Sequence, residues 1–234
     1  MLVFWWRDDD AEKVTPQIER LLTLAGRYSL PLALAVIPKG ATADLATRLA
    51  AEPNVAVLQH GWRHKRHSPD GEKKMELGDH RPLPEILGEL RAGCERLSML
   101  FPAQFLPVLV PPWNRIGAAV TAARASVGLA GLSLFGRETS GDPHSINTHL
   151  DIFAWQPARV PLTRAQAFAI LCRELEGRLA GDNRPIGIMT HHLVHEEANW
   201  ALLDELFAML ADHPAVSWPP IPELFGLPAT TARP

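Results

Sequence analysis

The sequence predicts an α/β protein in which strands and helices alternate around a parallel sheet. Short apolar runs of strand length alternate with longer stretches of helical period along the 234 residues. A barrel of such βα units fills this length as one domain, and no Gly/Ser linker or low-complexity segment divides the chain. We expect the domain to cover residues 1–227 and residues 228–234 to form a C-terminal tail.

The elements follow from local patterns. Six apolar runs predict strands at 2–6, 32–37, 55–58, 106–110, 131–135 and 186–189, and a seventh is expected near 152–155. Thr15 followed by Pro16 predicts a helix start, because threonine caps the first turn and proline suits its first position. Thr163 starts a helix over 164–179 in the same way, and further helices are expected over 84–100 and 199–210.

Composition excludes several classes of protein. Apolar residues make up 47% of the chain, charged residues 21%, and the net charge is -3. Because no stripe of Lys and Arg is interleaved with aromatic residues, we expect no nucleic-acid or anionic-membrane surface. No run approaches 18 apolar residues, and the first is too short for a signal segment, so a cytoplasmic protein is expected. Cys94 and Cys172 lack CxxC spacing and are expected to be free and buried.

Polar side chains follow four of the predicted strands. In parallel barrels the chemistry lies at the carboxyl ends of the strands, so these residues should converge on one mouth. The four groups are Asp8-Asp9-Asp10, His60 to His64, Pro111 to Arg115, and His191-His192. No G-x-S-x-G elbow, P-loop or G-x-G-x-x-G sequence accompanies them, which leaves serine hydrolases, NTPases and dinucleotide-binding proteins without their usual support.

The acidic run and the first histidine pair together indicate a metal site. Adjacent carboxylates repel one another unless a cation or proton relieves them, although acids also favour the first turn of a following helix. His60 and His64 are four residues apart, so both imidazoles can reach one ion. One carboxylate and two imidazoles form a ligand set typical of catalytic zinc, which keeps a position open for water.

The other groups leave two interpretations each. The segment from Pro112 through Trp113 to Asn114 is either a stiff turn or, with Trp62, an apolar wall of a substrate groove. One of His191 and His192 is either a general acid or a buried core histidine, and on a strand only one of the two faces the site. His149 and Asp151 precede the seventh predicted strand, and an Asp there could orient a catalytic His.

In their order along the chain, these motifs resemble those of the polysaccharide deacetylase (NodB-homology) family of carbohydrate esterases. The resemblance covers Asp8 to about His192 and implies a distorted (β/α)7 barrel and a hydrolase that removes acetyl groups from N-acetylated sugars with a divalent metal, zinc being favoured. It implies that one Asp is the general base, that a second Asp binds metal with His60 and His64, and that His191 is the acid. We assign Asp9 as base and Asp10 as ligand; the alternative is Asp8 and Asp9.

The sequence departs from the family pattern at two positions. Val110 replaces the Arg that usually precedes the Pro-Pro turn, so Arg7 or Arg115 would have to orient the base. Gly61 replaces the usual Ser or Thr. These departures keep two other functions open: hydrolysis of another linear or cyclic amide or ureide on the same barrel, and an inactive glycan-binding protein. The expected partner is therefore a carbohydrate or a small amide.

Overall fold

The central sheet is parallel and runs in the order β5-β4-β3-β2-β1-β9-β6, with β10 beside the start of β1. The computed structural model describes residues 1–138, 140–156 and 158–227, so the tail predicted for 228–234 lies outside the described residues. The strands of the sheet are β1 Leu2–Ala11, β2 Leu32–Val36, β3 Val55–His60, β4 Phe105–Val110, β5 Gly131–Leu132, β6 Leu150–Asp151, β9 Ile186–Thr190 and β10 Val216–Ser217.

The stretch that leads into β6 joins the two edges of this sheet. The Ile146 N–H donates to the Leu132 carbonyl at 3.0 Å, on the β5 side. The His149 N–H donates to the Gly187 carbonyl of β9 at 2.7 Å. Because one stretch bonds both β5 and β9, near opposite ends of the strand order, the sheet curls into a distorted barrel, and the predicted (β/α)7 fold class is confirmed.

The position predicted for the seventh strand was wrong. The strand of the barrel is β6, a few residues earlier than expected. Residues in the predicted range instead form β7 (Phe153–Ala154), which pairs antiparallel with β8 (Val160–Pro161). Periodicity missed the shift because the apolar run begins at Ile152, after the polar Asp151 of β6, and only the hydrogen bonds to β5 and β9 select the residues that enter the barrel.

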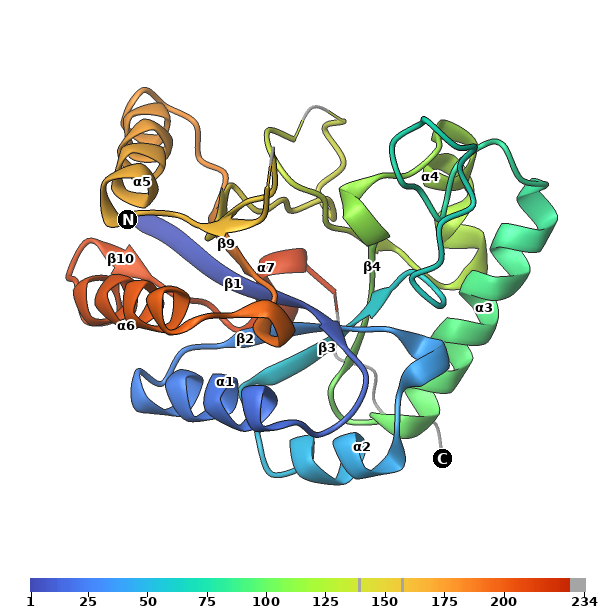
Figure 1. Cartoon of the computed structure of the whole chain (residues 1–234), viewed down its shortest axis with the longest axis horizontal. Coiled ribbons are helices and arrows are strands. Elements are labelled where there is room, and N and C mark those ends of the chain that lie inside the picture. The colour runs from blue at the N-terminus through green and yellow to red at the C-terminus, as the bar shows by residue number, and fades with distance from the viewer. Residues whose placement is uncertain (139, 157, 228–234) are drawn as a thin grey trace.

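Helices surround the curved sheet, and the short α7 lies against its inner side (Figure 1). The predicted capping residues perform as expected: Thr15 Oγ1 accepts the Ile18 N–H, and Thr163 forms a capping box with Gln166. The helices are α1 Pro16–Arg27, α2 Ala43–Leu49, α3 Leu83–Leu100, α4 Ala118–Ala123, α5 Arg164–Leu179, α6 Glu197–Leu210 and α7 Ile221–Phe225.

Residues of β1 alternate between the inside and the outside of the barrel. Trp5 belongs to the inner cluster and meets Phe225 of α7 edge-on, with ring centroids 5.6 Å apart. Phe4 and Trp6 belong to the outer cluster under the helices. Since successive strand residues point to opposite faces, Arg7 and Asp9 follow Trp5 inward, and Asp8 follows Trp6 outward.

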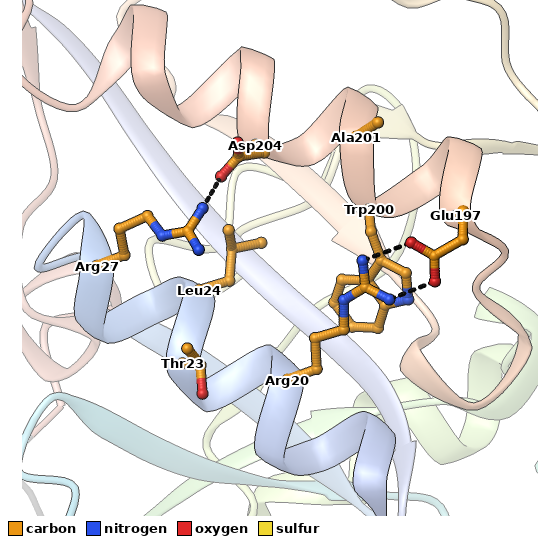
Figure 2. A pocket seen from close by; sticks show the side chains of 8 residues that line it. All are labelled: Arg20, Thr23, Leu24, Arg27, Glu197, Trp200, Ala201 and Asp204. Atoms are coloured by element: carbon orange, nitrogen blue, oxygen red, sulfur yellow. Dashed lines mark hydrogen bonds and ion pairs between the residues drawn. The ribbon is translucent and has the colours of Figure 1, made fainter.

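Helices α1 and α6 lie side by side on the outer surface, with a hollow of about 200 Å³ between them (Figure 2). Arg20 bonds Glu197 through two nitrogens, at 2.5 and 2.8 Å, and Arg27 bonds Asp204 at 2.6 Å. Exposed ion pairs of this kind contribute little to stability, because water and salt screen them. The hollow is therefore the gap left where the charged faces of α1 and α6 pack against each other.

Two further sequence predictions can be compared with the structure. Both cysteines are free, as expected, but Cys172 is exposed and only Cys94 is partly buried. None of the helices in the described part of the chain is both long and apolar enough to cross a membrane.

Candidate functional site

A β-bulge at the end of β1 determines which of the three aspartates face the barrel mouth. Asp8 pairs with Leu34 of β2, and the next partners in the ladder are Ala11 and Val36, so β1 carries one extra residue there. Asp10 lies in this extra turn, with a φ of 74° that residues other than glycine seldom adopt. The bulge turns Asp10 towards β3, where strict alternation would have turned it outward with Asp8.

Asp10, His60 and His64 bring three potential metal ligands together. One ligand atom from each lies within 4.8 Å of the other two. The His60 Nε2 atom is 3.1 Å and the His64 Nε2 atom 3.4 Å from Asp10 Oδ1. The His60 side chain is 2% exposed, whereas Asp10 and His64 are 29% and 26% exposed, so the cluster opens to solvent on one side.

The donor set fits a divalent cation. His60 Nδ1 lies 2.9 Å from the Val110 carbonyl, which can only accept, so Nδ1 carries a proton, and in the neutral ring Nε2 presents its lone pair to Asp10. In that form two acceptors face each other at 3.1 Å, an arrangement that a cation between them would stabilise. The pKa shifts agree: burial alone would raise the pKa of Asp10, but the surrounding histidines hold it well below its usual range. Burial lowers the pKa of His60, yet Asp10 and Asp9 raise it overall.

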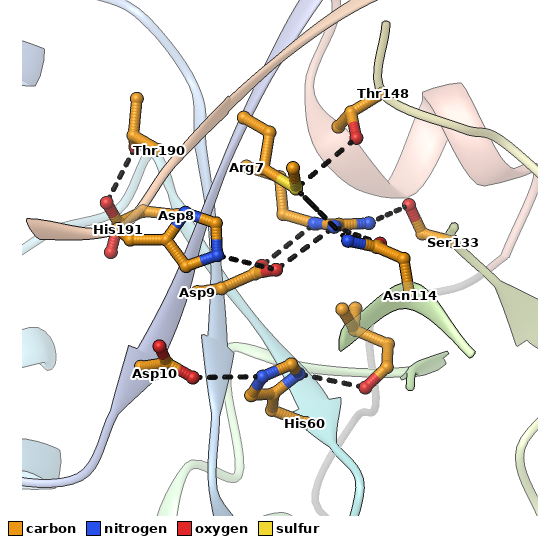
Figure 3. Close-up of polar contacts among 12 residues, drawn as sticks. Arg7, Asp8, Asp9, Asp10, His60, Asn114, Ser133, Thr148, Thr190 and His191 are labelled. Atoms are coloured by element: carbon orange, nitrogen blue, oxygen red, sulfur yellow. Dashed lines mark hydrogen bonds and ion pairs between the residues drawn. The ribbon is translucent and has the colours of Figure 1, made fainter. Parts of the chain in front are cut away.

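Arg7 holds the second inward carboxylate, Asp9. Arg7 Nε and Nη2 donate to the two oxygens of Asp9 at 2.8 and 3.0 Å (Figure 3). Other guanidinium contacts include the Ser133 hydroxyl at 2.7 Å and the Asn114 side-chain oxygen at 2.8 Å. Arg7 is fully buried, so its fork fixes the Asp9 carboxylate in one orientation.

His191 and His192 diverge, as expected for neighbours at the end of a strand. His191 Nε2 lies 3.9 Å from Asp9 Oδ2, on the mouth side (Figure 3). The Trp155 ring meets the His191 ring edge-on, with centroids 4.9 Å apart, and Trp155 Nε1 donates to Asp151 at 2.5 Å. Asp151 therefore holds the indole that packs against His191, and no direct hydrogen bond joins Asp151 to His191 in the described residues.

Asp8 lies apart from this group, on the outer face of β1. It is fully buried and bonds His192 Nδ1 at 2.5 Å, the Thr190 hydroxyl at 2.6 Å and the His192 N–H at 3.0 Å. Burial alone would raise the pKa of Asp8, but His192 lowers it overall, and Asp8 in turn raises the pKa of the His192 ring above its usual value. This pair joins β1 to the end of β9.

Solved structures with the same architecture exist. A Mycobacterium smegmatis protein assigned as a polysaccharide deacetylase superposes with a TM-score of 0.67 at 16% identity, over 93% of this chain and 81% of its own. The fold is that of the polysaccharide deacetylases. A family 4 acetyl xylan esterase from Clostridium thermocellum, solved with a cobalt ion, superposes with a TM-score of 0.59 at 14% identity, over 98% and 94% of the two chains. A family 4 carbohydrate esterase from Streptomyces lividans, solved with acetate, superposes with a TM-score of 0.58 at 13% identity, over 89% of this chain and 88% of its own.

The likeness to polysaccharide deacetylases is one of structure. No protein-family model matches the chain, and no curated protein sequence matches it.

Within this deacetylase fold, the two departures from the expected pattern have structural counterparts. Arg7 contacts Asp9 from inside β1, whereas Arg115 donates to the Lys74 carbonyl on the surface. Of the two arginines that the sequence offered as orienting groups, the structure brings only Arg7 to the carboxylate. Gly61 leaves room for the carboxylate of Glu76.

The residues expected to bind substrate lie in different surroundings. Trp113 has a φ of 57° and its ring centroid lies 4.4 Å from that of His64, so it borders the cluster. Pro112 is buried beside Gly61. Asn114 bonds Arg7, and Trp62 is partly buried with its N–H on Glu76.

His149 does not join the cluster. Its Nδ1 accepts the Gly187 N–H at 3.1 Å, and its Nε2 lies 3.5 Å from Arg178 of α5. Burial, reinforced by Arg178, lowers its pKa to about 4, so this ring is neutral near neutral pH. Of the two supporting residues predicted here, His149 and Asp151, the structure brings only Asp151 towards the mouth.

Sequence reasoning missed two buried groups at the site. Ser133 follows the short β5 and bonds Arg7, and Glu76 lies in the long connection between β3 and α3. Neither belongs to a motif. The sequence offers one indication for Ser133, its position near the start of the strand predicted for 131–135. For Glu76 it offers none, because a Glu among the charged residues at 72–76 looks like a solvated side chain.

Proposed function

We propose that the protein is a metal-dependent hydrolase that removes N-acetyl groups from an N-acetylated sugar or glycan. The observation that carries the proposal is the cluster of Asp10, His60 and His64 donor atoms within 4.8 Å, beside the Asp9 carboxylate. Its neighbours in fold include esterases solved with cobalt and with acetate, which fits a metal and an acetyl group at this mouth.

Asp10, His60 and His64 would hold the cation, and Zn²⁺ suits one oxygen and two nitrogen ligands. When bound, such a cation makes water more acidic and stabilises negative charge on an amide carbonyl oxygen. The partly exposed Asp10 and His64 leave a side of the cluster open to substrate.

Asp9 is the proposed general base. Its carboxylate is held by Arg7 on one side and lies 3.9 Å from His191 on the other, so its free lone pairs face the mouth. In this position it removes the proton from the attacking water. A fixed carboxylate is adequate for this step, because a cation held by the neighbouring cluster would lower the pKa of the water.

His191 is the proposed general acid. Its ring is packed against Trp155, and its Nε2 faces Asp9 across the gap in which the acetylated nitrogen would lie. Protonated His191 donates its proton to the departing amine, which completes cleavage of the amide bond.

The test is acetate release from a panel of N-acetylhexosamines and N-acetylated oligosaccharides by protein stripped of metal and then reloaded with Zn²⁺ or Co²⁺. We expect activity on at least one glycan that is lost on stripping and regained on reloading. Cyclic ureides form the comparison arm of the same assay. Turnover of a ureide without acetate release from any glycan would contradict the proposed substrate class.

A further inference from the structure

Glu76 is buried against the loop that carries His64. The structure gives it no exposed surface, although it is a carboxylate. It accepts three backbone N–H groups: its Oε2 bonds Trp62 at 3.1 Å, and its Oε1 bonds Arg63 at 3.0 Å and Lys65 at 3.3 Å. Since a buried charge is costly without such partners, these contacts are the interactions that keep Glu76 in place.

The loop that Glu76 binds has an unusual backbone. Between His60 and Lys65, both Gly61 and His64 have positive φ, at 55° and 53°. Histidine in this region is strained, and such strain persists only where the surroundings impose it. The carboxylate contacts the residues on both sides of His64, so it is the group that imposes this conformation.

Glu76 also explains the glycine in the histidine motif. A Cβ atom on Gly61 would lie 2.2 Å from Glu76 Oε2 and 2.6 Å from Pro112 Cδ. The space that a Ser or Thr side chain would fill at this position is thus occupied by the Glu76 carboxylate. The Glu76 carboxylate therefore requires a glycine at position 61.

Glu76 is in turn held by its own neighbours. The adjacent Met75 carbonyl accepts the His67 N–H at 2.9 Å, and the Leu77 carbonyl accepts the Gly117 N–H at 2.7 Å. The carboxylate is therefore fixed by backbone contacts on both flanks before it binds the loop.

From this geometry we infer that Glu76 is a positioning residue for the metal centre: it holds the 61–65 loop in the one conformation that brings His64 to Asp10 and His60. The inference rests on the proposed metal site. In this role Glu76, a buried carboxylate outside the histidine motif, orients the second imidazole ligand, His64.

The test compares Glu76→Gln with Glu89→Gln. The Gln side chain keeps the shape of Glu76 but presents an NH₂ group to at least one of the three N–H donors. Glu89 is the matched control, because it bonds the side chains of Arg63 and Arg81 in the same region but no loop N–H in the described residues. We expect Glu76→Gln to weaken Zn²⁺ binding about 10- to 100-fold, measured by chelator competition, and to change the visible absorption of the Co²⁺-loaded protein. Glu89→Gln should leave both unchanged.

Gly61→Ser provides a second comparison. The single variant should bind Zn²⁺ poorly, because its side chain meets the carboxylate. The double variant Gly61→Ser/Glu76→Ala should not recover Zn²⁺ binding, because Pro112 still crowds the added Cβ atom and the loop has also lost the Glu76 carboxylate. Zn²⁺ binding by Glu76→Gln within twofold of wild type, with an unchanged Co²⁺ spectrum, would overturn the inference.

A measurement on the unmutated protein covers the case in which the variants do not fold. Hydrogen exchange should show slowed amides at Trp62, Arg63 and Lys65 even without metal, and exchange of these amides at the rate of a free peptide would contradict the role of Glu76. If the wild-type protein bound no Zn²⁺, the proposed function would fail while the exchange result still tested the hold of Glu76 on the loop.

Discussion

Arg7 and Asp9 are two residues apart on β1 and form a two-point ion pair inside the barrel, with N···O distances of 2.8 and 3.0 Å. The i and i+2 residues of a strand share a face, so one strand supplies both the proposed base and the cation that orients it. In this chain the orienting arginine thus comes from the strand of the base and not from the Pro-Pro turn.

The Arg7 pair predicts the effect of a conservative change. Arg7→Lys keeps the charge but loses the planar fork that bonds both Asp9 oxygens, Ser133 and Asn114. We expect kcat for acetate release to fall about 10- to 100-fold with Zn²⁺ content unchanged, since one oriented proton transfer is worth about 10²- to 10⁴-fold. Arg115→Lys is the matched control, because the one hydrogen bond of its side chain in the described residues goes to the Lys74 carbonyl on the surface. Equal losses in the two variants would refute the role of Arg7.

Asp8 is predicted to be structural. Asp8→Asn leaves His192 buried without its ion pair, and removal of one partner of a buried pair costs about 3–5 kcal/mol. For a chain of this size that lowers Tm by about 10 °C. Calorimetry checks the stability, and metal analysis at a temperature where the variant is folded should give the wild-type content. Loss of metal from folded Asp8→Asn would instead favour Asp8 as a member of the site.

The Asp8–His192 pair also limits the pH range of stability. The pKa of Asp8 is lowered in the fold, so its contribution is lost as pH falls through that folded pKa. The pKa of His192 is raised, so its contribution is lost as pH rises through the folded value. The pair therefore contributes fully between the ordinary pKa of Asp and the ordinary pKa of His, and Asp8→Asn should flatten the loss of stability on both sides of that window.

His195 predicts a second pH effect. Its ring packs against Trp200, with centroids 4.4 Å apart, and neither ring nitrogen has a partner in the described residues. Burial lowers its pKa to about 4, against about 6.5 in the unfolded chain. The unfolded state therefore binds the proton first, and the free energy of unfolding should fall by up to about 1.4 kcal/mol per pH unit from about pH 6.5 to 4.

Urea denaturation at pH 7, 5.5 and 4.5 measures this slope. His195→Leu should show a shallower loss of stability with acid than wild type, while the exposed His80→Gln should keep the wild-type slope. Parallel profiles for wild type and His195→Leu would show that other groups dominate the acid response.

The sequence predicted where the site lies better than which atoms form it. Strand-end placement correctly gathered Asp9, Asp10, His60 and His191, because the apolar runs that bring them together are local patterns. The roles of the three aspartates depended on a bulge, which one extra residue in a ladder creates and no periodicity reveals.

Long-range contacts were the other source of missed features. Ser133 and Glu76 acquire their roles from partners 126 and 11 to 14 residues away, and His149 turns to Arg178 although it lies two residues from Asp151. Each of these side chains is polar, and a polar residue in a single sequence looks the same whether it is solvated or buried with partners. The barrel could be predicted because apolar residues recur along the sequence with the period of a strand or a helix. The residues of a buried polar network show no such period.

The division of labour between Asp9 and Asp10 is the central claim, and one paired measurement tests it most directly: Zn²⁺ content and acetate release of Asp9→Asn and Asp10→Asn, purified and assayed side by side. We predict that Asp9→Asn keeps the wild-type metal content and loses at least about 100-fold in kcat, whereas Asp10→Asn loses the metal and the activity together. An Asp10→Asn protein that retains full metal content and activity would contradict the account.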